Sequence, residues 1–152
     1  MWTQVIFHCC EFYRSVRYGR INPNADTGQR GEQAAARYLR QRGLVIVSEN
    51  EADRAGEIDL IAVDPKNRTI VFIEVKTHGC IKPGHPAERV GSQKQGRITR
   101  AASRYLKRKR LLGVPVRFDI VAIWWPNGLT TPTKIKHYES AFDAVGEYQF
   151  YS

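Results

Sequence analysis

Two extended segments joined by a short polar turn constrain the fold of this chain more than any other feature. Residues 57–64 and 69–76 are rich in branched and aromatic side chains, and Pro65-Lys66-Asn67-Arg68 separates them. Segments of this length and composition on either side of a turn are typical of a β-hairpin. The chain is therefore expected to contain a β-sheet built around this hairpin.

The remaining segments predict helices on a mixed sheet. In chain order they are a helix from Asp26 to Gly43 with its cap at Asp26 or Thr27, a short apolar run 44–47, a helix from a capping Ser92 to about Leu112, a strand 116–125 and an edge strand 133–138. Helices that alternate with strand groups in this way indicate an α/β fold with a mixed sheet flanked by helices.

The length of the chain indicates a single domain. Its 152 residues are enough for one apolar core. Residues 25–152 are assigned to this domain, and residues 1–24 to an N-terminal extension that ends in the turn-rich Asn22-Pro23-Asn24.

The cysteines and the first segment bear on localisation. The three cysteines form no C-x-x-C pair, and arginines interrupt the first apolar stretch. A cytoplasmic protein with no membrane segment is therefore expected.

The charge balance points to a polyanionic partner. Lys and Arg number 24 and Asp and Glu number 15, which gives a formal net charge of +9. Nucleic acid is the first candidate for a small domain with such a surplus, although a generally basic protein would show the same composition.

The hairpin register brings two carboxylates together. If Asp64 pairs with Thr69, Asp59 lies opposite Glu74 and Glu57 lies opposite Lys76. Opposed carboxylates repel unless a cation or a proton lies between them. Oxygen ligands without a nearby thiolate favour magnesium or manganese (Mg²⁺ or Mn²⁺). Lys76 is then placed to hold or deprotonate an attacking water and to stabilise charge on phosphorus.

The alternative to a metal site is an ordinary hairpin whose charged face is exposed to solvent. Simple alternation assigns Ile61, Val63, Ile70 and Phe72 to the face of the carboxylates, and it assigns Ile58, Leu60, Val71, Ile73 and Val75 to the opposite face. Because the carboxylate face is itself largely apolar, with its charges grouped at one end, a functional site is favoured over a solvated surface.

Glu32 is a carboxylate on the apolar stripe of the first helix. Ala35, Ala36 and Leu39 follow it at +3, +4 and +7. Two interpretations stay open: Glu32 is an acid near the helix N-terminus that interacts with the helix dipole, or it reaches the carboxylate site.

The second helix combines a basic arc with an apolar arc. The basic arc contains Arg97, Arg100, Arg104, Lys107 and Arg108, and the apolar arc contains Ile98, Ala101, Ala102, Tyr105 and Leu112. A basic arc of this kind can follow the phosphates of nucleic acid. A solvated charged face is the alternative, but the helix contains no acidic residue.

Histidine and tryptophan give weaker signals. His78 and His85 are interpreted as loop residues, because their spacing matches no helical zinc pair. Trp124 and Trp125 are expected to divide between core and surface, where an exposed ring can stack on an unpaired base.

Three motifs in order carry a resemblance to a known family: 28–32 (GQRGE), 56–61 (GEIDLI) and 71–77 (VFIEVKT). They resemble the YraN family of bacterial proteins, which is similar to Holliday-junction resolvases and to the restriction-endonuclease-like PD-(D/E)xK nucleases. The resemblance extends from about Asp26 to Ile123. It implies that Asp59 and Glu74 bind the metal with the Val75 carbonyl, that Lys76 is the catalytic lysine and that Glu32 is the helix-borne acid.

These observations lead to one principal hypothesis, a metal-dependent DNA phosphodiesterase. The family analogy adds branched DNA as substrate and a homodimer. A nucleic-acid-binding protein that keeps the nuclease fold without activity is the second reading, and a basic RNA-binding module is the third.

Overall fold

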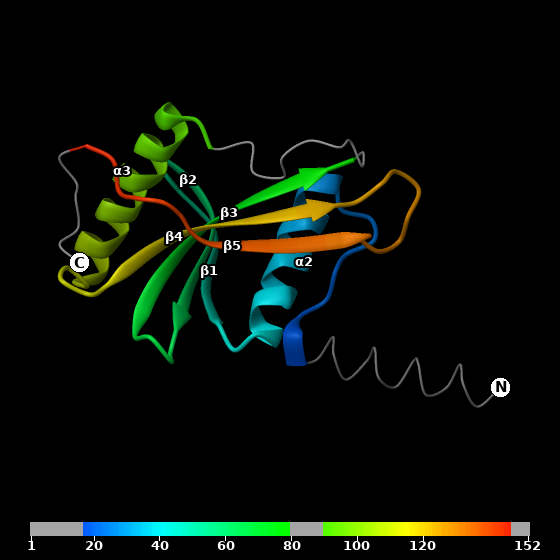
Figure 1. Ribbon diagram of the computed structural model, residues 1–152, viewed down its shortest axis with the longest axis horizontal. Helices are drawn as coiled ribbons and strands as arrows, with labels where there is room; N and C mark the ends of the chain where they lie inside the picture. The colour runs from blue at the N-terminus through cyan, green and yellow to red at the C-terminus, as the bar shows by residue number, and fades with distance from the viewer. Residues whose placement is uncertain (1–16, 80–89, 147–152) are drawn as a thin grey trace.

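The computed structural model describes residues 17–79 and 90–146, which form a five-stranded mixed sheet between two helices (Figure 1). The elements are α2 (Thr27–Gln41), β1 (Val45–Asp53), β2 (Gly56–Asp64), β3 (Thr69–His78), α3 (Ser92–Lys109), β4 (Val116–Trp124) and β5 (Lys134–Phe142). The strands follow chain order across the sheet. The β3/β4 pair is parallel and the other pairs are antiparallel. The predicted α/β class is confirmed, and the arrangement is consistent with a restriction-endonuclease-like fold.

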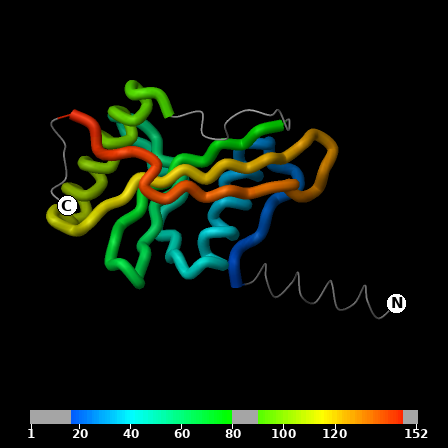
Figure 2. Tube along the Cα trace, viewed as in Figure 1, coloured from blue at the N-terminus to red at the C-terminus, as the bar shows by residue number. Residues whose placement is uncertain are grey.

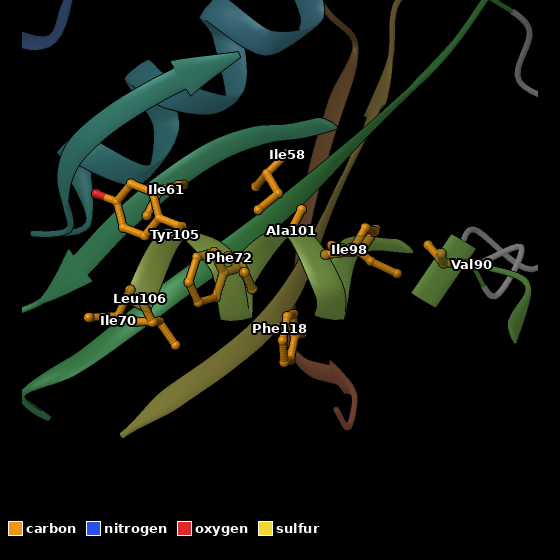
Figure 3. Close-up of a cluster of buried hydrophobic side chains, with 12 residues drawn as sticks. Ile58, Ile61, Ile70, Phe72, Val90, Ile98, Ala101, Tyr105, Leu106 and Phe118 are labelled. Atoms are coloured by element: carbon orange, nitrogen blue, oxygen red, sulfur yellow. The ribbon is translucent and has the colours of Figure 1, made fainter. Parts of the chain in front are cut away.

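Each face of the sheet buries a separate apolar cluster. Leu60, Val71 and Ile73 pack against α2, and Ile61 and Phe72 pack against α3. Figure 3 shows the cluster under α3, where Ile98, Tyr105 and other helix side chains meet the strands. Parallel strands need a crossover connection. In Figure 2 α3 provides it, because the helix ends beside the start of β4.

The hairpin forms in the predicted register but pairs over only part of its length. Asp64 pairs with Thr69 and the ladder continues to Leu60 and Ile73. Beyond that point β2 stays with β1 and β3 stays with β4, so Asp59 and Glu74 are not backbone partners. The expected pair of Glu57 with Lys76 is wrong for the same reason: Glu57 pairs with Ala52, and Lys76 pairs with Ala122.

Ile58 is a second correction. It belongs to the α3-side cluster, although simple alternation assigned it to the opposite face with Leu60. The irregularity coincides with Asn50, which has a left-handed φ of 53°. Glu49 pairs with Leu60 and Glu51 with Ile58, but Asn50 and Asp59 between them are unpaired. Alternation is lost where the ladder is interrupted.

The helix and strand boundaries were mostly close to expectation. Asp26 caps α2 by accepting a hydrogen bond from the Gln29 N–H at 2.9 Å, as predicted. Gly91, not Ser92, is the N-cap of α3, and this helix ends at Lys109, so Leu112 lies beyond it and is exposed. Pairing with neighbouring strands extends β1 and β5 beyond their apolar segments. In the described part of the chain, no helix has the length and apolarity needed to cross a membrane.

Candidate functional site

The candidate site lies where β2 and β3 separate. Asp59 Oδ2 accepts a hydrogen bond from the Val75 N–H at 2.7 Å. This carboxylate thus takes up a donor that continued strand pairing would have satisfied. The N–H and C=O of one strand residue point to the same side, so the Val75 carbonyl is also directed into the gap between the strands.

Glu74 is the most buried charged group of the site. Its side chain is 3% exposed, and Oε1 receives two ammonium groups: Lys76 Nζ at 3.2 Å and Lys94 Nζ in direct contact. Its second oxygen, Oε2, is buried and has no hydrogen-bond partner among residues 17–79 and 90–146. A buried carboxylate oxygen without a donor is unfavourable in an isolated fold. It is the type of atom that a bound cation would satisfy.

Asp59 has an unfavourable electrostatic environment. Burial, followed by the charge of Glu74, raises its pKa to about 7, although the hydrogen bond from Val75 acts in the opposite direction. The negative charges of Asp59 and Glu74 therefore repel each other. A divalent cation between them would favour the ionised form of both groups.

Glu32 approaches this site from α2 without joining it directly. Burial raises its pKa, which a hydrogen bond with Asn50 counteracts, and its charge contributes to raising the pKa of Asp59. The first turn of α2 contains no acidic residue. The helix-dipole interpretation of Glu32 is therefore wrong, because that interaction fades beyond the first turn.

Gly31 explains how α2 comes so close to the site. A Cβ at this position would overlap the side chain of Thr77, the residue after Lys76. Only glycine allows the helix to pack against this end of β3. The neighbouring Glu32 is thereby carried toward Asp59.

The oxygen atoms around the gap suit magnesium or manganese. Asp59, Glu74 Oε2 and the Val75 carbonyl are all hard ligands. No group of three or more His, Cys, Asp or Glu side chains gathers around one point in the described residues. Magnesium does not need such a cage, since one or two carboxylates with water and phosphate oxygens are sufficient. The residues present therefore fit the metal that the resemblance implies.

Lys94 is a site residue that the sequence analysis missed. Although burial opposes it, the hydrogen bond and charge of Glu74 raise the pKa of Lys94. A usable signal was present in the sequence. Ile98, Ala101 and Tyr105 follow Lys94 at +4, +7 and +11, which places this lysine on the buried stripe of α3 by the argument that selected Glu32.

The basic arc of α3 divides into two parts. Arg97, Arg100 and Lys107 are exposed. Arg104 is bound to Asp53 at 2.5 Å, and Arg108 is bound to Glu51. Both acidic partners lie on β1, more than 50 residues away in sequence, so the absence of acids within the helix was misleading.

Two minor interpretations are corrected. His78 is the last residue of β3, not a loop residue, and its ring lies 5.8 Å from that of Trp124. Both tryptophans are buried, with 8% and 1% exposure, so the expected surface ring is absent. His85 and the three cysteines lie outside the described residues, as does most of the N-terminal extension.

Comparisons with known proteins agree with the motifs. The model of the uncharacterised protein family UPF0102 matches residues 31–123. A UPF0102 protein of Rhodopirellula baltica is 59% identical over 140 residues, which cover 92% of this chain and 84% of the relative. A UPF0102 protein of Syntrophotalea carbinolica is 39% identical over 119 residues, or 78% of this chain and 93% of the relative.

Proposed function

The chain belongs to the UPF0102 (YraN) family, as the motifs predicted, and we propose that it is a metal-dependent DNA phosphodiesterase. The observation that carries the proposal is a pair of carboxylates at the point where β2 and β3 separate, the half-buried Asp59 and the buried Glu74. Asp59 has a pKa raised to about 7, and Glu74 has a buried oxygen that meets no hydrogen-bond donor in the part of the chain that the structure describes. Two lysines adjoin the pair.

Each group has a chemical role in this proposal. Asp59, Glu74 and the Val75 carbonyl would hold Mg²⁺ or Mn²⁺, which supplies Lewis acidity and makes water a better nucleophile. Lys76 orients the attacking water and stabilises charge that develops on phosphorus. Lys94, which contacts Oε1 of Glu74, would add a second positive charge beside the substrate phosphate. The formal charge of +9 favours a polyanionic substrate.

Cleavage of DNA by the purified protein tests the proposal. Linear, single-stranded, flap and four-way-junction DNA would be incubated with magnesium, manganese or EDTA. We expect cleavage only with metal. Lys76→Ala should lower the rate by about 100-fold or more while keeping metal binding, whereas Asp59→Asn should lose both.

Glu57→Gln is the matched control, because it changes an exposed carboxylate two residues from Asp59 on the same strand. Metal-dependent cleavage by Asp59→Asn at the parent's rate would remove this site from the chemistry. DNA binding without cleavage would assign the protein to the non-catalytic class, and a preference for structured RNA would indicate the RNA-binding module.

A further inference from the structure

The sheet carries a second basic surface, beside the carboxylate site. The pairing register aligns Lys76 of β3 with Ala122 of β4, and Ala122 with Lys136 of β5. Lys134 lies one step further, opposite Trp124. Neighbouring strands are about 4.8 Å apart, so the backbone of Lys136 is roughly 10 Å from that of Lys76.

These lysines lie on the same face of the sheet as Glu74. Ile120 and Tyr138, which follow Glu74 across the same row of the register, both pack into the α3-side cluster. Lys136 and Lys134 are two and four residues from Tyr138, so alternation keeps them on that face. In Figure 1 α2 lies behind this end of the sheet, and neither described helix lies in front of it.

Aromatic rings, not carboxylates, hold the two ammonium groups. Lys136 Nζ is 4.6 Å from the centre of the Tyr138 ring, and Lys134 Nζ is 5.1 Å from that of Trp124. Neither lysine forms an ion pair with a carboxylate of residues 17–79 or 90–146. The acidic residue of β5, Glu139, instead pairs with Arg117 at 3.2 Å.

This arrangement positions positive charge without neutralising it. A cation over a ring face keeps its full charge and its outward hydrogen-bond donors. Both lysines are exposed, whereas Trp124 is too buried to stack on a base. The surface is therefore suited to phosphate groups, and it has no means of reading base sequence.

We propose that Lys134 and Lys136 continue from Lys76 as a phosphate-binding strip, along which the backbone of a DNA strand leaves the carboxylate site across β5. This inference rests on the proposed function and gives its substrate a direction. The DNA strand would cross the sheet at the end where β3 and β4 finish and β5 begins. Its path would not require contacts with the C-terminal half of α3.

Binding in EDTA tests the strip separately from cleavage. The affinity of the parent and of the Lys134→Gln/Lys136→Gln variant for a labelled DNA duplex and its single strand would be measured by fluorescence anisotropy over a range of salt concentrations. We expect weaker binding, and a salt slope for the duplex that is smaller by about 1.8, since each phosphate contact contributes about 0.9. Circular dichroism would show that the variant is folded.

Lys66→Gln/Lys109→Gln is the matched control, because it removes two exposed lysines far from the strip, one of which also lies over a tyrosine ring. Its slope should equal that of the parent. Equal slopes for strip variant, control and parent would overturn the strip, and metal-dependent cleavage by the parent would leave the proposed function standing. A parent that binds no DNA in EDTA would also overturn the strip.

Discussion

Two carboxylate sites lie on the same sheet, Asp119 in one and Asp59 with Glu74 in the other, and the fold compensates their charges to different extents. Asp119 of β4 has no exposed surface. It accepts hydrogen bonds from the Arg117 guanidinium at 2.9 Å and from the Ser140 N–H at 3.0 Å, and it contacts His137 Nε2 at 2.7 Å. At the other site, one oxygen of Glu74 has no hydrogen-bond partner within the described residues, and the pKa of Asp59 is raised.

The difference separates a structural carboxylate from a binding one. Both oxygens of Asp119 accept hydrogen bonds from Arg117, and Ser140 and His137 of β5 contact them as well, so this residue links β4 to β5. At Asp59 and Glu74 the fold brings two acids together and leaves their demand unmet. Burial of a carboxylate alone therefore does not indicate function. A carboxylate that lacks hydrogen-bond donors or compensating positive charge does.

The largest expected effect on stability is at Asp119. Asp119→Asn should lower the free energy of unfolding by about 3 kcal/mol, because it removes a buried charge from a fully paired network. Urea unfolding followed by circular dichroism would measure it, and the loss should be the same with EDTA and with manganese. A variant as stable as the parent would show that Asp119 is not structurally required.

A change in stability of the opposite sign is expected at Asp59. In EDTA above pH 7, Asp59→Asn should raise the free energy of unfolding by roughly 1 to 2 kcal/mol, since it removes like-charge repulsion and keeps the shape of the side chain. Millimolar manganese should stabilise the parent more than the variant and so reverse the order. Asp59 is a better probe than Glu74, whose charge already has two lysine partners. Destabilisation by Asp59→Asn in EDTA would contradict the repulsion.

The pH dependence of stability follows from the raised pKa of Asp59. Its folded pKa of about 7 exceeds the ordinary value of 3.8, so between these values the folded state holds a proton that the unfolded state releases. The contribution of Asp59 to stability should therefore fall as pH rises from about 4 to 7 in EDTA, and then level off. Subtracting the profile of Asp59→Asn isolates this component. A flat difference would show that the pKa is not raised.

The smallest expected effect applies the same distinction to cations on α3. Arg104 and Arg108 are paired with acids of β1, whereas Arg97 and Arg100 are exposed. Arg104→Gln/Arg108→Gln should cost at most about 1 kcal/mol of stability, as partly exposed ion pairs do, and should hardly change the salt slope of DNA binding. Arg97→Gln/Arg100→Gln should make the affinity for DNA depend less steeply on salt concentration. Equal slopes for the two variants would show that pairing does not decide which arginines bind DNA.

The sequence predicted the parts of the molecule that depend on local pattern. The hairpin register, the Asp26 cap and the burial of Ala35, Ala36 and Leu39 all follow from strand alternation, turn chemistry and helical spacing. These features need only neighbours along the chain or across one turn.

Features that depend on distant segments were missed. The separation of β2 from β3 arises because each strand continues along a different partner, and the ion pairs of Arg104 and Arg108 join α3 to β1. Asn50 interrupts alternation through a left-handed backbone that no local pattern indicated. The burial of Lys94 could have been predicted, because its spacing places it on the apolar stripe of α3.

Binding of manganese is the most direct test of a metal site between β2 and β3. Electron paramagnetic resonance of free Mn²⁺ would give the affinity of the parent, of Asp59→Asn and of the Glu57→Gln control, each with and without a non-cleavable DNA analogue. We expect the parent and the control to bind alike, and Asp59→Asn to bind at least about ten-fold more weakly, a loss of about 1.4 kcal/mol. Equal manganese affinity of the parent and Asp59→Asn, with DNA present, would contradict a metal site at these carboxylates.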